Sequence, residues 1–441
     1  MNKKIILVEA PVETASGYGM RSTDMVRSLL KMINHDEWDI KILSTNWGMT
    51  PKVSLKPGKD DDILNLILKP GEQLTQKPEV HFQITVPNEF RPLGKFSVGV
   101  TAGIETTICD SSWIEGCNRM NLILVSANHG KNVLQHTKYD KIDNNTKQVI
   151  ESLLIKTPIE VLFEGVDLNI FKPEYNKSEV IEETVGKIPE KFVFLYNGAW
   201  LRGEIGQDRK NTGMLVKVFL EAFKNQENPP ALLMKTSGAT YSYLDEKEIK
   251  DKIKAIKKTV KGKLPNIYLF HGHVSDNEVN DLYNHPKVKC MVNFTKGEGY
   301  GRPLLEFSVT NKPIITSNWS GHTDFLKSEF STLVGGKLEE IHESAIMDKL
   351  LVKGSQWFTI DYQQAGGVMI DMVKNYHPYE DKAKKQGYSS RNSFSFNKMT
   401  ELLKQHWNKY IPEFASMQTF QLPKLNKIEL PKLQLPKLNK I

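Results

Sequence analysis

The chain has 441 residues, of which 39% are hydrophobic and 25% charged, and its formal net charge is +7. This composition excludes a disordered or collagen-like chain, and the length predicts two domains, or three, that each bury a core. The three cysteines form no CxxC pair and no metal-ligand spacing, and no apolar run approaches the roughly 20 residues of a membrane span. We therefore expect a cytoplasmic protein with no disulfide framework and no transmembrane segment.

The positive charge is concentrated in two segments, residues 245–263 and 421–441, which carry +4 each. Within the first, Ile249, Ile253 and Ile256 recur at helical spacing, which predicts an amphipathic helix with a solvated lysine face. The remainder of the chain is close to neutral. A nucleic-acid-binding surface over the whole protein is therefore not favoured, and a local basic patch is the remaining alternative.

The first half of the chain alternates short apolar runs with helical patterns. Four of these runs predict β-strands, at residues 5–9, 38–44, 80–86 and 121–126. The glycine-rich segment ASGYGMRS, residues 15–22, follows the first run and precedes a helix whose apolar residues recur at helical spacing. Such alternation predicts a parallel sheet covered by helices on both faces. We assign residues 1–175 to this first α/β domain.

The same pattern restarts near residue 190, after a polar stretch rich in Glu and Lys. Further apolar runs predict strands at residues 191–198, 231–237, 266–272, 289–294 and 313–318. We assign residues 190–385 to a second α/β domain and place the joint between the two domains near residues 173–189.

The last residues, 413–441, differ from the rest of the chain. The heptapeptide LPKLNKI occurs at 422–428 and again at 435–441, so this tail is basic and of low complexity. Its recurrent prolines exclude a regular helix or a central strand. Two alternatives stay open: a mobile tail, or a peptide that docks on the body of the chain or on a protein partner.

The segment KGEGYGRPLLEF, residues 296–307, directly follows a predicted strand. Pro303 is typical of the first turn of a helix, so residues 297–302 are expected to form the loop between strand and helix. Gly299 and Gly301 allow a ligand to approach the backbone, and the free N–H groups at a helix start favour a phosphate. The segment therefore predicts a phosphate-binding loop.

Two carboxylates, Glu298 and Glu306, belong to the same segment, with seven residues between them. Carboxylates accept hydrogen bonds from sugar hydroxyls, so the two could hold the sugar rings on either side of a diphosphate, as in a nucleotide sugar. Acidic residues also occur in first helical turns for the helix dipole alone. The pair by itself leaves both interpretations open.

Residues 298–321, EGYGRPLLEFSVTNKPIITSNWSG, resemble the signature of the family 4 glycosyltransferases, a retaining group with the GT-B fold. The matching positions are Glu298, Gly299, Gly301, Pro303, Glu306, residues 312–315, Ser320 and Gly321. Other segments are similar to motifs of that family in the same order, at residues 113–134, 159–173, 195–211 and 271–284. The resemblance covers most of residues 1–330. It departs from the family at Asn121, where an Asp is usual, and in the helix FSVTN, where smaller residues are commoner.

The resemblance implies an α/β fold of the GT-B type, in which two Rossmann-like domains face each other across a cleft. Residues 1–175 would form the acceptor-side domain and residues 190–385 the nucleotide-sugar-binding domain. In this fold a C-terminal helix crosses back to the first domain. Residues 386–412 suit that helix, because their apolar residues recur at helical spacing.

The resemblance also implies roles for individual residues. Glu298 corresponds to the acid that meets the hydroxyls of the donor sugar and supports charge at the transferred carbon, and Glu306 to the acid that holds the ribose. Arg209 and Lys210 correspond to the basic pair beside the diphosphate, where fixed cations stabilise the charge of the leaving group. Some relatives place a cation directly after the strand-end glycine. Here Arg202 lies in an insertion-like stretch, so Arg202 is a second candidate for the diphosphate.

Two glycine-rich loops are expected to line the donor site. The first, with Gly17 and Gly19, is similar to the family's loop that reaches across the cleft to the donor phosphate, and a simple tight turn is the alternative. From the second loop we expect Gly299, Tyr300 and Gly301 to contact the donor.

The acceptor side is less well defined by the sequence. Glu105 and Thr106 match a Glu-Thr pair that some members of that family contain, and we expect these two residues to contact the acceptor or the donor sugar. A helix N-cap by Thr106 or Thr107 is the alternative. His129 is a further acceptor-side candidate, although a lone histidine is more often structural or exposed.

The leading hypothesis is a retaining glycosyltransferase that moves a hexose from a UDP- or GDP-sugar to a carbohydrate or other hydroxyl acceptor in the cleft. We expect neither a metal nor another cofactor, because the DDD triplet at residues 60–62 is expected in a solvated loop and cations replace the metal in this family. Two alternatives remain: a DNA-base glycosyltransferase that modifies hydroxylated bases, and a non-catalytic protein that binds sugar nucleotides or glycans. The near-neutral remainder of the chain argues against the first, and the complete set of donor-site charges against the second.

Overall fold

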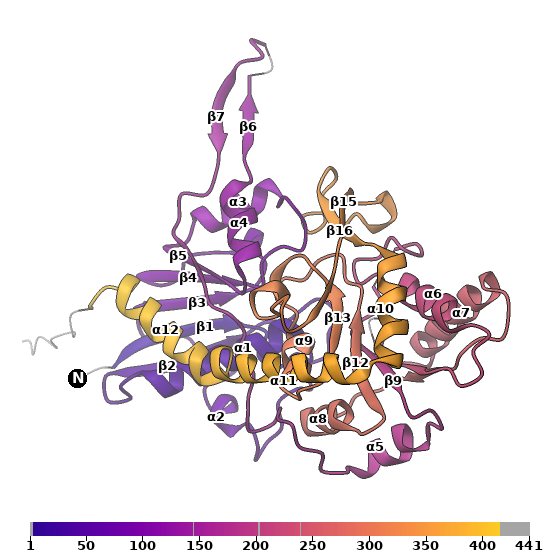
Figure 1. The fold of residues 1–441 in the computed structure, drawn as a ribbon. Coiled ribbons are helices and arrows are strands. Elements are labelled where there is room, and N and C mark those ends of the chain that lie inside the picture. Colours follow the sequence, from indigo (N-terminus) through magenta and orange to yellow (C-terminus); the bar gives the residue numbers. More distant parts are fainter. Residues whose placement is uncertain (1–2, 144, 202, 239, 415–441) are drawn as a thin grey trace, which may run out of the picture.

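The structure, a computed structural model, describes residues 3–143, 145–201, 203–238 and 240–414 (Figure 1). Arg202, predicted to contact the donor, and residues 415–441 of the predicted tail lie outside this description. Among the helices that it contains, none is long and apolar enough to cross a membrane.

Residues of the first half form a six-stranded parallel sheet with the order β2-β1-β3-β4-β5-β8. Its strands are β1 (Lys4–Ala10), β2 (Trp38–Ser44), β3 (Val80–Ile84), β4 (Phe96–Thr101), β5 (Leu122–Val125) and β8 (Ile159–Val161). They are apolar along most of their length because both faces of the sheet are covered. One face packs on α1 (Gly17–Met32) and α12 (Phe396–Tyr410), and the other on α3 (Ser111–Asn118) and α4 (Asn128–His136).

The second half repeats this architecture with the order β11-β10-β9-β12-β13-β14. Its strands are β9 (Val193–Asn197), β10 (Ala231–Lys235), β11 (Ile267–Phe270), β12 (Val288–Asn293), β13 (Ile314–Ser317) and β14 (Thr332–Val334). The helices α6 (Thr212–Phe223), α7 (Tyr243–Thr259) and α10 (Tyr362–Lys374) cover one face. The other face carries α5 (Glu179–Thr184), α8 (Asp276–Asn284) and α9 (Arg302–Ser308). The two α/β domains predicted from the sequence are therefore present.

Every strand predicted from an apolar run is found, with ends that differ by at most a few residues. Three further parallel strands, β4, β8 and β14, were not predicted. Ser and Gly interrupt the apolar pattern of FSVGVT in β4, and β8 and β14 have only three residues each. Such short or interrupted runs carry too weak a periodicity to be recognised alone.

The chain crosses between the domains twice, and the two crossings lie side by side. The N–H of Val166 donates to the carbonyl of Phe394 at 2.9 Å, and the N–H of Phe396 donates to the carbonyl of Val166 at 2.8 Å. After this point α12 lies along α1, with Met399 and Leu403 buried in the core of the first domain (Figure 1).

The domain limits lie elsewhere than the sequence analysis placed them. Phe171 was assigned to the first domain, within residues 1–175, but it packs in the core of the second, because the chain crosses at Val166. The limit at residue 385 falls inside the continuous helix α11 (Tyr376–Ser393). Neither a buried phenylalanine nor a helix interior is marked by a local change of composition.

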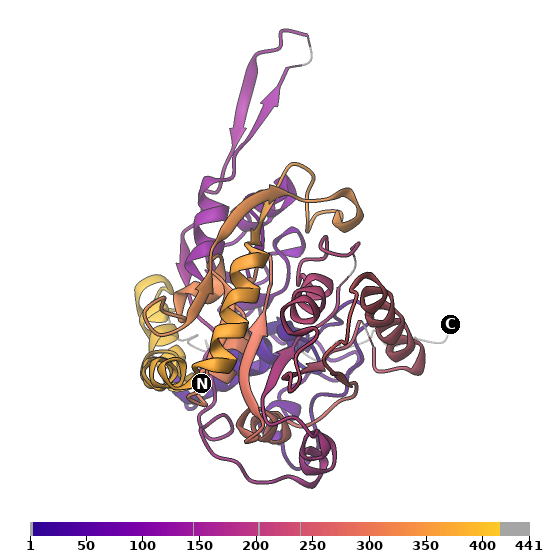
Figure 2. The ribbon, with the colours of Figure 1, turned by 45° about the vertical axis from the view of Figure 1, so that its right-hand side comes forward.

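Two antiparallel strand pairs that were not predicted form separate two-stranded sheets. β15 (Gly336–Glu340) pairs with β16 (Gln356–Ile360), and β6 (Tyr139–Ile142) pairs with β7 (Val149–Leu153). The β6–β7 hairpin projects far from the body of the molecule in both views (Figure 1 and Figure 2). The remaining short elements are α2 (Asp61–Leu64), η1 (Pro87–Glu89), η2 (Val185–Lys187), η3 (Gly321–Asp324) and η4 (Glu343–Ala345).

Candidate active site

The candidate site lies where the connection order of the second sheet reverses. From β9 the chain moves to β10 and β11 on one side, and then returns to β12 on the other side of β9. The loops after β9 and β12 carry Arg209–Lys210 and Gly297–Gly301, so both leave the carboxyl ends of neighbouring strands. In open α/β sheets, ligands bind in the crevice at such a switch point.

The centre of this crevice is an ion pair between Lys210 and Glu298. The Nζ atom of Lys210 lies 2.5 Å from Oε1 and 2.7 Å from Oε2 of Glu298. Arg209 lies 3.6 Å from the same carboxylate and donates a hydrogen bond to the carbonyl of Gly297 at 2.6 Å. Burial raises the pKa of Glu298, but the charges of Lys210 and Arg209 outweigh it and lower the pKa to about 2. Glu298 is therefore an ionised carboxylate that holds two cations.

Arg209 also connects this cluster to the first domain. Its Nη2 atom lies 3.5 Å from Oε1 of Glu105, in the loop after β4. Burial lowers the pKa of Arg209, but Glu105 and Glu298 raise it further. Acidic and basic side chains thus alternate across the cleft, and the acceptor-side candidate Glu105 lies directly beside the predicted donor-site cations.

Glu306 lies one turn into α9 and has different partners. The Nε atom of Arg302 lies 2.9 Å from Oε1 of Glu306, and its Nη1 atom lies 2.5 Å from Oδ2 of Asp24 in α1. Burial raises the pKa of Glu306 to about 7, against the attraction of Arg302. The two predicted acids therefore have separate cationic partners, and Arg302, which was not predicted as a site residue, links Glu306 to the first domain.

Lys235 is a buried cation at the same end of the sheet that the sequence analysis did not consider. It ends β10, opposite Asn197 of β9 in the sheet register. Burial lowers its pKa, while Glu306 and Asp276 are the charges that raise it. In the described part of the chain its ammonium group has no ion-pair partner. The available signal was a lysine at the carboxyl end of an apolar strand, in ALLMK.

The glycines of the loop after β12 are needed for contact between the domains. A Cβ atom on Gly297 would lie 2.0 Å from the carbonyl oxygen of Glu105, and one on Gly299 would lie 2.8 Å from that of Ala102. Gly301 has φ of +94°, which favours glycine. The predicted close approach at Gly299 is thus an approach by the first domain. The side chain of Tyr300, a predicted donor contact, is buried in the core of the second domain.

The first glycine-rich segment is the opening turn of α1, where Ser16 is the N-cap and accepts a hydrogen bond from the N–H of Gly19 at 3.0 Å. A Cβ atom on Gly19 would lie 2.0 Å from the carbonyl oxygen of Thr14, so the tight turn requires this glycine. Around Gly17 there is no atom within 4 Å of such a Cβ. Of the two glycines predicted to contact the donor, only Gly17 is therefore next to open space.

The other acceptor-side candidates are more enclosed. The Thr106 hydroxyl is buried and donates to the carbonyl of Ile108 at 3.0 Å. The N-cap of α3 is Asp110, so the alternative of a cap by Thr106 or Thr107 was wrong. His129 is half-buried at the start of α4, and its ring meets that of Trp319 in the second domain edge-on, with centroids 4.6 Å apart.

Further hydrogen bonds hold the two domains together around the cleft. The N–H of Thr107 donates to the carbonyl of Gln356 at 3.0 Å, and the N–H of Gln356 donates to Oγ1 of Thr107 at 2.9 Å. The N–H of Asn128 donates to Oδ2 of Asp324 at 2.8 Å. These bonds therefore hold the loop after β4 and the start of α4 against the second domain.

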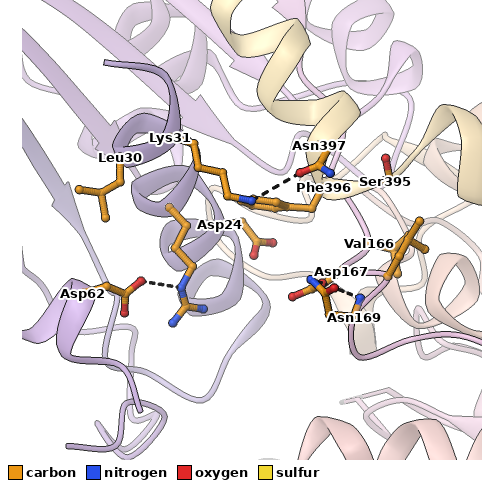
Figure 3. Close-up of a pocket in the computed structure, with 12 residues that line it drawn as sticks. Asp24, Leu30, Lys31, Asp62, Val166, Asp167, Asn169, Ser395, Phe396 and Asn397 are labelled. Atoms are coloured by element: carbon orange, nitrogen blue, oxygen red, sulfur yellow. Dashed lines mark hydrogen bonds and ion pairs between the residues drawn. The ribbon is translucent and has the colours of Figure 1, made fainter. Parts of the chain in front are cut away.

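A separate cavity of about 410 Å³ lies at the interdomain crossing (Figure 3). Lys31 of α1 spans it, with Nζ 4.5 Å from the ring centroid of Phe396 and 3.4 Å from Oδ1 of Asn397. Asp24 lines this cavity and also pairs with Arg302. The cavity is thus next to the Glu306 side of the site, and none of the predicted site residues lines it.

Among the residues that the structure describes, no group of three or more His, Cys, Asp or Glu side chains could hold a metal ion. Of the DDD triplet, Asp60 and Asp62 pair with Arg27 at 2.7 and 3.0 Å. Two of its three charges therefore face an arginine of α1, and the expectation of a solvated loop was wrong, because Asp60 is buried and Asp61 begins the helix α2.

The fold is that of the GT-B glycosyltransferases. The structural alignment with a glycosyltransferase from Rickettsia africae includes 94% of this chain and 100% of that protein's chain, with a TM-score of 0.59 and 16% sequence identity. Sucrose-phosphate synthase from Thermosynechococcus elongatus covers 92% of this chain and 99% of its own, with a TM-score of 0.59 and 10% identity. HepE from Anabaena, solved with UDP and glucose, covers 92% of this chain and 100% of its own, with a TM-score of 0.58 and 11% identity. No protein-family model and no curated protein sequence matches the chain.

Proposed function

We propose that this protein is a retaining glycosyltransferase that moves a hexose from a nucleoside diphosphate sugar to a hydroxyl acceptor in the interdomain cleft. The observation that carries the proposal is the buried cluster of Glu298, Lys210 and Arg209 at the switch point of the second sheet. Its fold neighbour HepE has been solved with UDP-glucose, which makes uridine donors the first to test.

In the proposed reaction the bond between the anomeric carbon and a phosphate oxygen breaks, and negative charge grows on the leaving diphosphate. Lys210 and Arg209 are fixed cations in a buried site and would stabilise that charge. Glu298 stays ionised at neutral pH because these cations lower its pKa. Its carboxylate would accept hydrogen bonds from sugar hydroxyls and offset the positive charge that develops at the anomeric carbon.

Retention of configuration requires the acceptor to attack from the face that the leaving group vacates. The acceptor oxygen forms the new bond to the anomeric carbon, and its proton passes to the leaving phosphate. Glu306 would hold the ribose, and the charge of Glu306 also acts on Lys235 at the end of β10. The proposal needs no metal, because the cations take the role that a metal would have.

The acceptor is proposed only as a carbohydrate or another hydroxyl compound. A DNA acceptor is not favoured, because Lys247, Lys250 and Lys252 of α7 pair with acidic residues on the same helix at 2.5 to 2.9 Å. A cytoplasmic location stays part of the proposal, since the cysteines are unpaired and buried.

The test is a screen of UDP- and GDP-sugars for binding and for slow hydrolysis, with wild type and Glu298→Ala. We expect one donor to be hydrolysed by the wild type and its hydrolysis to be lost in the variant. If a donor binds but neither protein hydrolyses it, and if no carbohydrate or other hydroxyl acceptor produces turnover, the non-catalytic alternative would be supported. Absence of binding to any nucleotide would overturn the nucleotide-sugar proposal.

A further inference from the structure

Two histidines, one from each domain, present ring nitrogens that are buried without a hydrogen-bond partner among the described residues. They are Nδ1 of His322, in η3, and Nε2 of His129, at the start of α4. Neither His322 nor its role was predicted from the sequence. A buried polar atom without a partner costs free energy, so each such atom calls for an explanation.

Hydrogen bonding at the other ring nitrogen identifies the tautomer of His322. Its Nε2 atom lies 2.7 Å from the carbonyl oxygen of Ser317, and a carbonyl can only accept. Nε2 therefore carries the proton. Burial lowers the pKa of His322, so the ring is neutral and Nδ1 is a bare acceptor.

His129 leaves the other ring nitrogen, Nε2, without a partner. A backbone hydrogen bond to Thr106 raises its pKa, although burial outweighs it and lowers the pKa to about 4. The ring is therefore neutral at pH 7. Its Nε2 atom is the ring nitrogen that is buried without a partner among the described residues, and so it is the one left for a ligand.

Both acceptors belong to the same cleft as Glu298. His322 is fully buried against the loop after β12, where a Cβ atom on Gly301 would lie 3.0 Å from the Cβ of His322. Glu298 and Lys210 are among the charged groups that act on its pKa. The bond from Asn128 to Asp324 holds the start of α4 against η3, which brings His129 to the same place from the first domain.

We propose that His322 Nδ1 and His129 Nε2 accept hydrogen bonds from hydroxyl groups of the transferred sugar and thereby select it. This inference rests on the proposed function. Phosphates and carboxylates offer only acceptors to these nitrogens, whereas each sugar hydroxyl offers a donor. Glu298 alone binds any hydroxyl pair within reach, but two fixed imidazoles on opposite domains demand hydroxyls at two defined positions.

The experiment compares the affinity of a sugar nucleotide with that of its bare nucleotide, by titration calorimetry. The probes are UDP-glucose with UDP, and GDP-mannose with GDP, on wild type, His322→Phe and His129→Phe. Phenylalanine keeps the ring volume and removes the acceptor. We expect the affinity for UDP or GDP to stay within about twofold, while the affinity for the sugar nucleotide falls about three- to tenfold for each variant, as for one lost hydrogen bond.

His406→Phe is the matched control. The His406 ring lies on α12, and its Nε2 atom is 2.9 Å from the carbonyl oxygen of Val161, as Nε2 of His322 is bonded to Ser317, but His406 has no buried nitrogen without a partner among the described residues. We expect neither affinity to change in this variant. His322→Asn supplies a second variant, because its amide oxygen can replace Nδ1 as acceptor. It should recover part of the sugar-dependent affinity even if the phenylalanine variant fails to fold.

Deoxy analogues of the donor that binds separate recognition from a structural role. Removing the hydroxyl that donates to His322 should weaken binding to wild type and cause no further loss in His322→Phe. The inference would be overturned if the loss of affinity caused by each missing hydroxyl simply added to the loss caused by the histidine substitution. It would also be overturned if a variant lost equal affinity for the sugar nucleotide and for the bare nucleotide. Neither result would affect the proposed function. Failure of the wild type to bind any of the four probes would overturn the proposed function itself, and this inference with it.

Discussion

The ammonium group of Lys210 lies between both carboxylate oxygens of Glu298, at 2.5 and 2.7 Å, although 88 residues separate the two in the chain. Lys210 leaves β9 and Glu298 leaves β12, and these strands are neighbours only in the folded sheet. Glu298 thus neutralises the positive charge of Lys210, which would otherwise be free to bind the diphosphate of a donor. A donor must therefore share Lys210 with Glu298, and this competition leads to the first two predictions.

Removal of the Lys210 charge should abolish most of the turnover. For Lys210→Met we expect the rate of donor hydrolysis or transfer to fall about 10²- to 10³-fold, because a fixed cation at the leaving group is lost. The measurement is a steady-state rate at saturating donor. Lys224→Met is the control, since Lys224 pairs with Glu221 on the outer surface of α6. A similar loss in both variants would show that the effect is not specific to the site.

Neutralising Glu298 should separate turnover from nucleotide binding. In Glu298→Gln, Lys210 is no longer neutralised, so we expect UDP to bind as tightly as to wild type or severalfold more tightly. Turnover should fall about 100-fold, because the negative charge beside the anomeric carbon is gone. Calorimetry with UDP and the rate assay together test this. A parallel fall of affinity and rate, in a protein with an unchanged melting temperature, would contradict the competition between Glu298 and the diphosphate.

Glu306 should make stability depend on pH. Its pKa is raised by burial from 4.5 to about 7, so the folded protein holds a proton that the unfolded chain releases. The contribution to stability is present below about pH 4.5 and is lost as the pH rises to about 7. Relative to Glu306→Gln, we expect the wild type to lose up to about 3 kcal/mol over this window. Denaturant unfolding at several pH values measures the difference, and equal slopes for the two proteins would contradict it.

Arg21 should be important for stability without any contact to a substrate. Its side chain is buried and donates to the carbonyls of Leu162 at 2.5 Å and Phe163 at 2.8 Å, which joins α1 to the first interdomain crossing. For Arg21→Met we expect a loss of about 3 kcal/mol in the free energy of unfolding, because buried carbonyls lose a charged donor.

Arg27→Met on the same helix is the control for Arg21. Arg27 is 36% exposed and pairs with Asp60 and Asp62, so about 1 kcal/mol is expected from its loss. Urea unfolding followed by circular dichroism measures both variants. Equal effects would show that the buried carbonyls do not depend on Arg21.

A methyl group at Gly297 should push the domains apart. In Gly297→Ala the Cβ would lie 2.0 Å from the Glu105 carbonyl oxygen, so the first domain must move. We expect turnover to fall at least tenfold, by analogy with other misplacements of catalytic groups, and the radius of gyration in small-angle X-ray scattering to rise. Gly367→Ala in α10 is the control, because its Cβ would meet no atom within 4 Å. An active and equally compact Gly297→Ala protein would contradict the contact.

Local patterns in the sequence were sufficient for most strands of the two six-stranded sheets, since apolar periodicity depends on neighbouring residues only. The motif around Glu298 also indicated the loop after β12, because Pro303 and the glycines determine a strand-to-helix turn by themselves. Apolar runs failed for the short strands β8 and β14, and for the β6–β7 hairpin, which has little buried surface to create a pattern.

The role of a glycine was harder to predict than its position. Gly19 was expected to face a phosphate, yet it is required by its contact with Thr14, and Gly299 is required by its contact with Ala102. A glycine motif reports that something approaches the backbone. Only the folded chain shows whether the approaching group belongs to a ligand, to the same loop or to the other domain.

The sequence by itself determined the two α/β halves and most of their strands, and its resemblance to the family 4 glycosyltransferases indicated the four charged residues offered to a donor. These follow from short-range patterns, and the chain needs no distant contact to display them. The tertiary structure decided that Lys210 neutralises Glu298, that Glu105 reaches Arg209 from the other domain, and that the charges of Glu306 and Glu298 act on Lys235 and His322, respectively. The physical reason is that the strand order reverses after β11 and that the two domains dock on each other. Both events bring together side chains that are far apart in the sequence, and no local pattern in the sequence indicates such contacts.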